Sequence, residues 1–272
     1  MDIFNFFTLN NSDNITFSSA ILSIIFGIIA CLITASLGIP QLISILKEKK
    51  TGNVNYISYW IFYIGCCLWI IFGCYQDGTK LIPIAIANII SVFTYNIMMI
   101  ATYQFDKRLN KREKTIGQIS SFVTMLVFCL LGILGLSLNL SYGTTAGEII
   151  TPFLAIVTPM LTTFAFIPVV AHQFKTKDFS GMSKGMSFIF VLNNVMWNLY
   201  WIFIIVNRYN GPADVTKTLV SLEDALKNGL KETETIFKWS IAATISTFVW
   251  QTISLIIYSG QFTFMLKTKN RK

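Results

Sequence analysis

The chain reads GIPQLISILKEKKTGNVNYISYWIFYIGCCLWIIFG at residues 38–73, and a stretch with the same plan follows 128 residues later. Pro40 and Trp69 of the first stretch recur as Pro168 and Trp197. Apolar residues between each proline and its tryptophan match at the same offset, so the resemblance keeps its order along the chain. A shared order of this kind predicts an internal duplication of one supersecondary unit.

The repeat continues after the tryptophans at a larger offset. An offset of 155 residues aligns Ser91 with Ser246 and Tyr103 with Tyr258. The rise from 128 to 155 predicts an insertion of 27 residues in the second copy. The insertion coincides with the one long polar stretch, at residues 207–235, whose leucine spacing predicts an amphipathic helix. A position on the outer membrane surface is favoured, and a lid over the outer mouth or a partner-docking helix are the alternatives.

The composition is that of a membrane protein. Hydrophobic residues make up 54% of the chain and charged residues 12%, against about 25% charged residues in a soluble domain. A membrane-spanning helix needs about 20 apolar residues. The sequence predicts seven such spans: Phe17–Leu46, Ile57–Tyr75, Leu81–Phe105, Ile116–Leu138, Glu148–Phe174, Met186–Val206 and Phe237–Leu266.

The predicted spans group as three, one and three. We expect an all-α membrane protein with a first three-helix bundle at residues 17–105 and a second at residues 148–266. The fourth span, within residues 106–147, lies outside the repeat and serves as a linker helix. Two copies of a three-helix bundle run parallel only if one extra crossing restores the orientation of the chain.

Loop charges predict the orientation in the membrane. Fifteen of the 21 Lys and Arg residues fall in loops and tails on one side of the predicted spans. By the positive-inside rule, the N-terminus lies outside and the C-terminus in the cytoplasm. We therefore expect a multi-pass plasma-membrane protein, and the abundance of Ile, Lys and Asn favours a bacterial source. The net charge of +8 is explained by topology and contact with anionic lipid, without a nucleic-acid partner.

The positions of the acidic residues bear on whether the protein can couple transport to an ion. All 13 Asp and Glu residues fall in predicted loops, termini or helix ends, so no carboxylate within a span is available for ion coupling. The five cysteines lack zinc-type spacing with histidines, and no phosphate-binding loop or catalytic constellation is present. The sequence predicts a protein that is no enzyme and needs no metal or cofactor.

Three segments of the first copy carry a family resemblance. They are Gly38-Ile39-Pro40-Gln41, the run Leu68–Gly73, and the run Ile82–Asn88. Together they resemble the PQ-loop family and, within it, the SWEET and SemiSWEET sugar facilitators. The resemblance implies three-helix bundles that are either dimerised or fused through a linker helix. One copy of this chain would then suffice for a transport pathway, and a homo-oligomer is left open.

The resemblance also implies roles for individual residues. In SWEET-like transporters a Trp on the second helix and an Asn on the third line the substrate cavity, which here implies Trp69 and Asn88. The first-helix prolines act as hinges, which implies Pro40 and Pro168. The sequence departs from the family pattern at two further positions: Val169 stands where a second Gln would match Gln41, and Ala243 matches Asn88.

A polar and aromatic stripe lies in the sixth predicted span. Its members fall at helical spacing and form one face: Asn193, Asn194, Trp197, Asn198, with Tyr200 and Trp201 beside them. Amides are costly facing lipid, so the stripe should face the bundle interior. Trp faces cover the apolar side of a pyranose or heteroaromatic ring, and Asn offers a donor and an acceptor. We predict a substrate site there, with Gln251 of the last span standing in for the missing second Asn; interhelical amide packing is the alternative.

The favoured function is a passive, alternating-access facilitator of a small polar solute, with sugar first. The alternative within transport is an amino acid or a vitamin- or nucleoside-like solute. Proton coupling through Asp178 or His172 is a separate alternative to passive transport. A non-transporting receptor with the same bundle fold is the alternative of another class. It would need a charged pocket within the membrane, and the sequence shows none.

Overall fold

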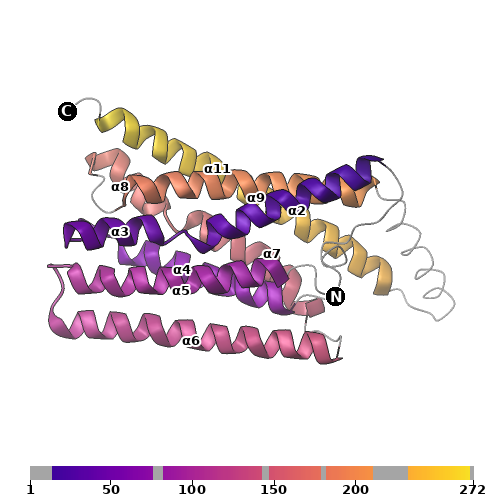
Figure 1. Ribbon diagram of the computed structural model, residues 1–272, viewed down its shortest axis with the longest axis horizontal. Coiled ribbons are helices and arrows are strands. Elements are labelled where there is room, and N and C mark those ends of the chain that lie inside the picture. Colours follow the sequence, from indigo (N-terminus) through magenta and orange to yellow (C-terminus); the bar gives the residue numbers. More distant parts are fainter. Residues whose placement is uncertain (1–13, 76–81, 143–146, 179–181, 211–231, 270–272) are drawn as a thin grey trace.

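The structure is a computed structural model, and it describes residues 14–75, 82–142, 147–178, 182–210 and 232–269. Every regular element in these ranges is an α-helix (Figure 1). In chain order they are α2 (Asn14–Ala35), α3 (Ile39–Glu48), α4 (Tyr56–Tyr75), α5 (Ile82–Phe105), α6 (Lys111–Tyr142), α7 (Gly147–Phe164), α8 (Ile167–Thr176), α9 (Lys184–Asn210) and α11 (Glu232–Lys269). The all-α prediction is confirmed for this part of the chain.

Six helical stretches in the described part are long and apolar enough to cross a membrane, and they correspond to the first six predicted spans. The seventh prediction falls on α11, which is 38 residues long. Its described part carries Gln251 and Gln261 among serines and threonines and is more polar than the other six stretches. The seventh membrane span therefore stays a prediction. The predicted amphipathic helix within residues 207–235 falls mostly on residues 211–231, outside the described residues.

Both proline-containing spans consist of two helices with a break between them. The first breaks between Ala35 and Ile39, and the second between Phe164 and Ile167. Each proline then lies in the first turn of the following helix, where its missing N–H leaves no hydrogen bond unmade. Expected hinges at Pro40 and Pro168 thus sit immediately after real breaks in the helices. That the breaks bend during function stays a prediction.

The packing of the helices has the same plan in both halves. Helix α5 contacts α2 and α4, and α11 contacts α7 and α9 in the same way. Between the halves, α2 packs along α9 and α4 packs along α7. Helix α6 contacts α4 and α5 and forms the outer edge of the bundle beside α5 (Figure 1). Each half therefore places its third helix between its first and second helices, and the first helix of each half faces the second helix of the other.

The glutamine of the first proline motif caps a helix of the other half. Gln41 is buried, and its Oε1 accepts the backbone N–H of Ser183 at 2.7 Å, just before α9 begins. This bond satisfies one of the N–H groups that a helix start leaves unpaired. Val169, at the equivalent position, has no acceptor, and Asn55 Oδ1 caps α4 locally by accepting the N–H of Ser58 at 3.3 Å.

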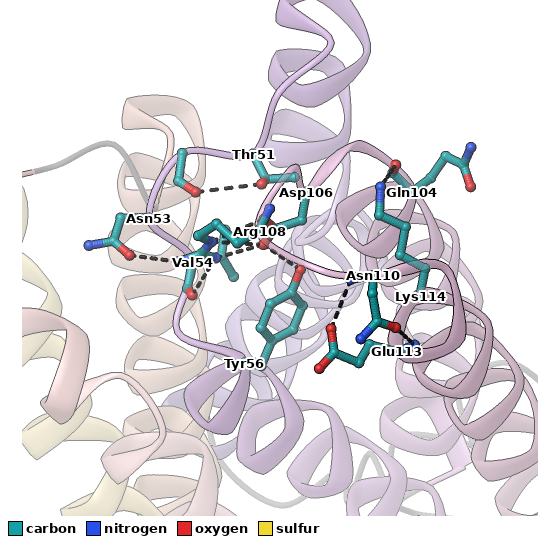
Figure 2. Close-up of polar contacts among 11 residues, drawn as sticks. Thr51, Asn53, Val54, Tyr56, Gln104, Asp106, Arg108, Asn110, Glu113 and Lys114 are labelled. Carbon is teal, nitrogen blue, oxygen red and sulfur yellow. Dashed lines mark hydrogen bonds and ion pairs between the residues drawn. The ribbon is translucent and has the colours of Figure 1, made fainter.

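An ionic clasp ties the loop before α4 to the loop after α5 (Figure 2). The carboxylate of Asp106 is 1% exposed and accepts a hydrogen bond from Arg108 Nη2 at 2.6 Å and from the Tyr56 hydroxyl at 2.8 Å. Arg108 also donates to Asn53 Oδ1 at 2.7 Å and to the carbonyl of Val54 at 3.0 Å. One guanidinium thus fixes the chain on both sides of the clasp. We refer below to this end of the bundle, which carries α3 and α8, as the α3 end.

Acid weakens the clasp. Burial by itself would raise the pKa of Asp106, but the hydrogen bonds and charge of Arg108, with the Tyr56 hydroxyl, lower the pKa below its ordinary value. A carboxyl with a lower pKa in the folded chain adds stability above its unfolded pKa of about 3.9. That stability is lost as the pH falls through the still lower folded pKa.

Replacing Arg108 by Met should lower the free energy of unfolding by about 2 kcal/mol or more at pH 7, because a buried carboxylate loses its cation. Lys114→Met is the matched control, since Lys114 donates only an exposed bond to the carbonyl of Gln104 and should cost under about 1 kcal/mol. Thermal unfolding in detergent measures both. Equal melting temperatures for the two variants would contradict a structural role for the clasp.

Candidate functional site

A central cavity lies between the two halves, where six helices converge. It is lined from α2, α4, α5, α7, α9 and α11. Six of the eight predicted binding residues line it: Trp69, Asn88, Asn193, Asn194, Trp197 and Gln251. The structure thus brings together side chains that are up to 182 positions apart in the sequence.

The other two predicted residues lie outside the lining. Asn198 sits one turn beyond Asn194 and uses its Oδ1 to accept a hydrogen bond from Thr252 of α11 at 2.7 Å. Tyr200 points toward α2 and packs against Gly27. On a helix, positions 198 and 200 fall at the two edges of the face that carries positions 193, 194, 197 and 201, so their side chains reach the neighbouring helices α11 and α2. Neither residue enters the site that we propose below.

A hydrogen-bonded strut joins α2 to the polar wall of the cavity. The hydroxyl of Thr34 donates to Asn193 Oδ1 at 2.7 Å and accepts from Trp197 Nε1 at 2.9 Å. All three side chains are buried and line the cavity. Because Thr34 lies only a few residues before the break that precedes α3, it connects that break directly to the cavity wall.

Helix α4 has no amides at the positions where α9 contributes two of them to the cavity. Gly65 and Cys66 occupy the positions equivalent to Asn193 and Asn194. Gly65 is required by close packing, since a Cβ there would lie 2.6 Å from the Thr162 methyl group. Thr162, the repeat equivalent of Thr34, hydrogen-bonds to carbonyls of its own helix. The amides of the cavity therefore come from α5, α9 and α11, and α4 contributes only apolar and aromatic groups.

A buried donor at the cavity has no partner. Trp201 lines the cavity and is 4% exposed, and its Nε1 makes no hydrogen bond among the described residues. A buried unpaired N–H costs about 1–3 kcal/mol. Among buried indoles such a group is unusual, and it marks a position where an acceptor oxygen of a bound solute would be stabilised.

An aromatic cluster closes the cavity at the α3 end. Phe62 and Phe190, which are repeat equivalents, meet edge to face with ring centroids 4.9 Å apart. Phe166 packs on both at 5.4 and 5.3 Å, and Tyr258 stacks on Phe190 at 5.0 Å. These four rings, which we call the aromatic floor, are almost fully buried. They form the barrier that a solute would have to pass to leave by this end.

The cavity is small in this conformation. The space open to the centre of a water-sized sphere is about 40 Å³, and one water needs about 10–15 Å³ by this measure. A few water molecules fit, and a hexose does not. The helices must therefore move before a solute of that size can occupy the site.

Among the lining residues that sequence reasoning missed, four carry a hydroxyl group, namely Thr34, Thr162, Ser254 and Tyr258. Thr34 and Thr162 match at the offset of 128 residues, so the repeat itself carried a signal for them. Their short hydroxyl side chains, set in apolar spans, gave no contrast with ordinary packing residues. Ser254 and Tyr258 follow Gln251 on one face of α11 at helical spacing.

A separate polar pocket of about 220 Å³ lies at the α3 end, between the loop before α4 and helix α8. It brings together His172 and Asp178, the two residues named for proton coupling, with Gln173, Asn53 and Asn55. Among the described residues, no three His, Cys, Asp or Glu side chains come close enough together to hold a metal ion.

Thr34→Ala should weaken solute binding about tenfold, because Asn193 and Trp197 each lose a hydrogen bond worth about 1 kcal/mol. Thr162→Ala is the matched control: it removes the equivalent hydroxyl from the same cavity but no bond between helices, and should change affinity by less than about threefold. Thr34→Ser should restore binding. Equal losses in Thr34→Ala and Thr162→Ala, measured by calorimetry, would mean that the strut does not position the wall.

Comparisons with known proteins find similarity over part of this chain. A family model described as a PQ-loop repeat matches residues 22–82. The chain is 26% identical over 73 residues to a protein named sugar transporter SemiSWEET from Leptospira biflexa, a match that covers 27% of this chain and 82% of that relative. It is 35% identical over 68 residues to an uncharacterized protein from Methanocaldococcus jannaschii, covering 25% of this chain and 70% of the relative.

Proposed function

Because this chain belongs to the PQ-loop family, we propose that it is a membrane transporter, a passive alternating-access facilitator whose substrate is a small polar solute, with sugar favoured. The observation that carries the proposal is the central cavity between the halves. Its lining combines amide groups, indole rings and the Nε1 of Trp201, which has no hydrogen-bond partner in the described part of the chain. The SemiSWEET relative is itself named a sugar transporter.

The mixed lining of amides and indoles suits a sugar. A pyranose presents hydroxyl groups around its edge and C–H groups on its faces. The amides of Asn88, Asn193 and Gln251 could exchange donors and acceptors with the hydroxyls, and the indole of Trp69 could cover a C–H face. A heteroaromatic solute such as a nucleoside would meet the same wall by stacking.

The mechanism that we propose is rocking of the two halves about the cavity. In the conformation described, the aromatic floor blocks the α3 end, so passage requires the floor to part. The breaks before α3 and α8 are the places where we expect the first helix of each half to bend, because the regular helix is already interrupted there. We take the α3 end to be cytoplasmic, from the charges of its loops.

The first test is a thermal-shift screen of purified protein against sugars, amino acids and vitamins. A ligand present at 100 times its Kd stabilises the folded chain by about 2.7 kcal/mol, which raises the melting temperature measurably. Stabilisation by a sugar that disappears in Asn88→Ala supports the proposal. Stabilisation only by amino acids or nucleosides would replace the substrate class, and stabilisation by no small solute would favour a receptor.

Proton-coupled transport is the second candidate, and the pocket at the α3 end favours it. His172, near the end of the fifth apolar stretch, and Asp178, just beyond that stretch, line this one pocket on the face we assign to the cytoplasm. A proton shared there would have to bind one conformation more tightly than the other in order to drive transport. Counterflow without an imposed ion gradient separates this candidate from passive transport.

The hinge role of Pro40 makes a kinetic prediction. Pro40→Ala should slow solute exchange several-fold while leaving the Kd within about twofold, because the change acts on the barrier between conformations and Pro40 does not line the cavity. Leu42→Ala, in the same helix, is the control for a general loss of packing. Stopped-flow exchange with parallel calorimetry measures rate and affinity. If both fell in proportion, Pro40 would shape the site instead of the hinge.

A further inference from the structure

A second cavity opens on the side of the bundle between α2, α5 and α9. It has a volume of about 280 Å³ and is lined almost wholly by apolar side chains. Gly27, Cys31 and Ala35 fall at intervals of four residues, so they share one face of α2. Ala87 of α5 adds a fourth small side chain. Small residues on facing helices leave the hollow, which we call the side groove.

Two aromatic residues of α9 line the groove where it meets the bundle interior. Tyr200 lies so close to α2 that a Cβ on Gly27 would be 3.0 Å from its ring carbon Cδ2. Trp197, one turn earlier, lines the side groove and the central cavity alike. The bond from its Nε1 to Thr34, 2.9 Å long, fixes the indole in this position. The indole of Trp197 is therefore a partition between the two cavities.

The mouth of the groove opens on the outer surface of the helix bundle, which faces the bilayer. Leu32 is 67% exposed and Ile86 49% exposed, and both belong to stretches that are long and apolar enough to cross a membrane. The groove is continuous with this apolar surface. An apolar cavity does not hold ordered water, and a vacant one forfeits dispersion contacts along its whole lining. The substance that covers this face in a bilayer is hydrocarbon.

We propose that the side groove is an acyl-chain site, in which one hydrocarbon tail of a bilayer lipid lies against Trp197 on the side opposite the solute. The tail completes the packing of a wall that the central cavity shares. The proposal does not depend on the transported solute or on transport itself; it requires only that the helices lie in a bilayer.

The test is quenching of tryptophan fluorescence by lipids brominated on the acyl chain, with the full chain reconstituted in bilayers. The fraction quenched should be larger for the wild type than for Trp197→Phe, because that variant removes the indole that contacts the chain. Ala87→Leu, which fills the groove, should lower the quenched fraction to that of Trp197→Phe. Ile97→Phe adds bulk to the exposed face of α5 outside the groove and should leave the quenching unchanged.

Two results would overturn the proposal. One is equal quenching in the wild type, Trp197→Phe and Ala87→Leu, with circular dichroism showing all three folded. The other is an unquenched Trp197 together with cross-linking between copies through Leu32→Cys, which would mean that a second copy of the chain covers the groove. If Ala87→Leu does not fold, Cys31→Leu fills the same groove from α2 and replaces it.

Discussion

Asn88→Ala is expected to reduce solute uptake in proteoliposomes about tenfold or more while leaving the folded yield near that of the wild type. Asn88 lines the central cavity, and its Nδ2 donates at 2.8 Å to the carbonyl of Ile84 on its own helix. The bond orients the amide without tying it to another helix. Loss of one or two hydrogen bonds to a solute, at about 1 kcal/mol each, accounts for the effect.

Asn96→Ala is the matched control on the same helix. Asn96 is also a buried amide, but it lies outside the cavity lining and donates to the Tyr63 hydroxyl of α4 at 3.1 Å. This variant should lose stability and keep uptake per folded molecule. The reverse pattern, with Asn88→Ala unstable and Asn96→Ala inactive, would assign the packing role to Asn88. Trp197→Phe can be measured alongside Asn88→Ala. It is preferable to Trp197→Ala, because the indole of Trp197 is buried and its complete removal would also lower stability.

Phe190→Ala is expected to open the aromatic floor. The native thiol of Cys66 lines the central cavity and is 2% exposed. Removing the ring of Phe190 deletes its contacts with Phe62, Phe166 and Tyr258. Alkylation of Cys66 by a membrane-impermeant thiol reagent, followed by mass spectrometry in nanodiscs, should accelerate at least about tenfold, since about 1.4 kcal/mol of lost packing suffices.

Phe188→Ala is the control for this experiment. Phe188 lies one half-turn away on α9 and is 51% exposed, so its loss should leave Cys66 protected. Phe190→Leu, a milder change, serves if the alanine variant is too unstable to purify. Unchanged protection of Cys66 in both Phe190 variants would show that the floor is not the barrier at the α3 end.

Helix positions and the family followed from the sequence because they rest on long-range regularities. Runs of apolar residues predicted six helical spans that the structure describes, and the repeat of Pro40 and Trp69 pointed to the family. The convergence of Asn88 with Asn193 and Trp197 was also foreseeable, since amides in an apolar span must face the protein interior. Periodicity and polarity carry these inferences without knowledge of side-chain contacts.

The details of the site depend on pairings between helices that a single sequence does not encode locally. Asn198 belongs to the same stripe as Asn194, yet Thr252 of α11 takes its oxygen. Thr34 is an inconspicuous residue until its hydroxyl is seen between Asn193 and Trp197. Gly65 becomes meaningful only through its contact with the methyl group of Thr162. Each of these facts is set by the crossing of two distant helices.

The central claim is passive transport through the cavity between the halves, and counterflow tests it most directly. Proteoliposomes are loaded with unlabelled solute, identified in the thermal-shift screen, and diluted into labelled solute with no pH or sodium gradient. We predict transient accumulation of label that is unaffected by an ionophore and greatly reduced in Asn88→Ala. Accumulation that requires an imposed proton gradient, and that His172→Ala or Asp178→Asn abolishes, would contradict the passive mechanism.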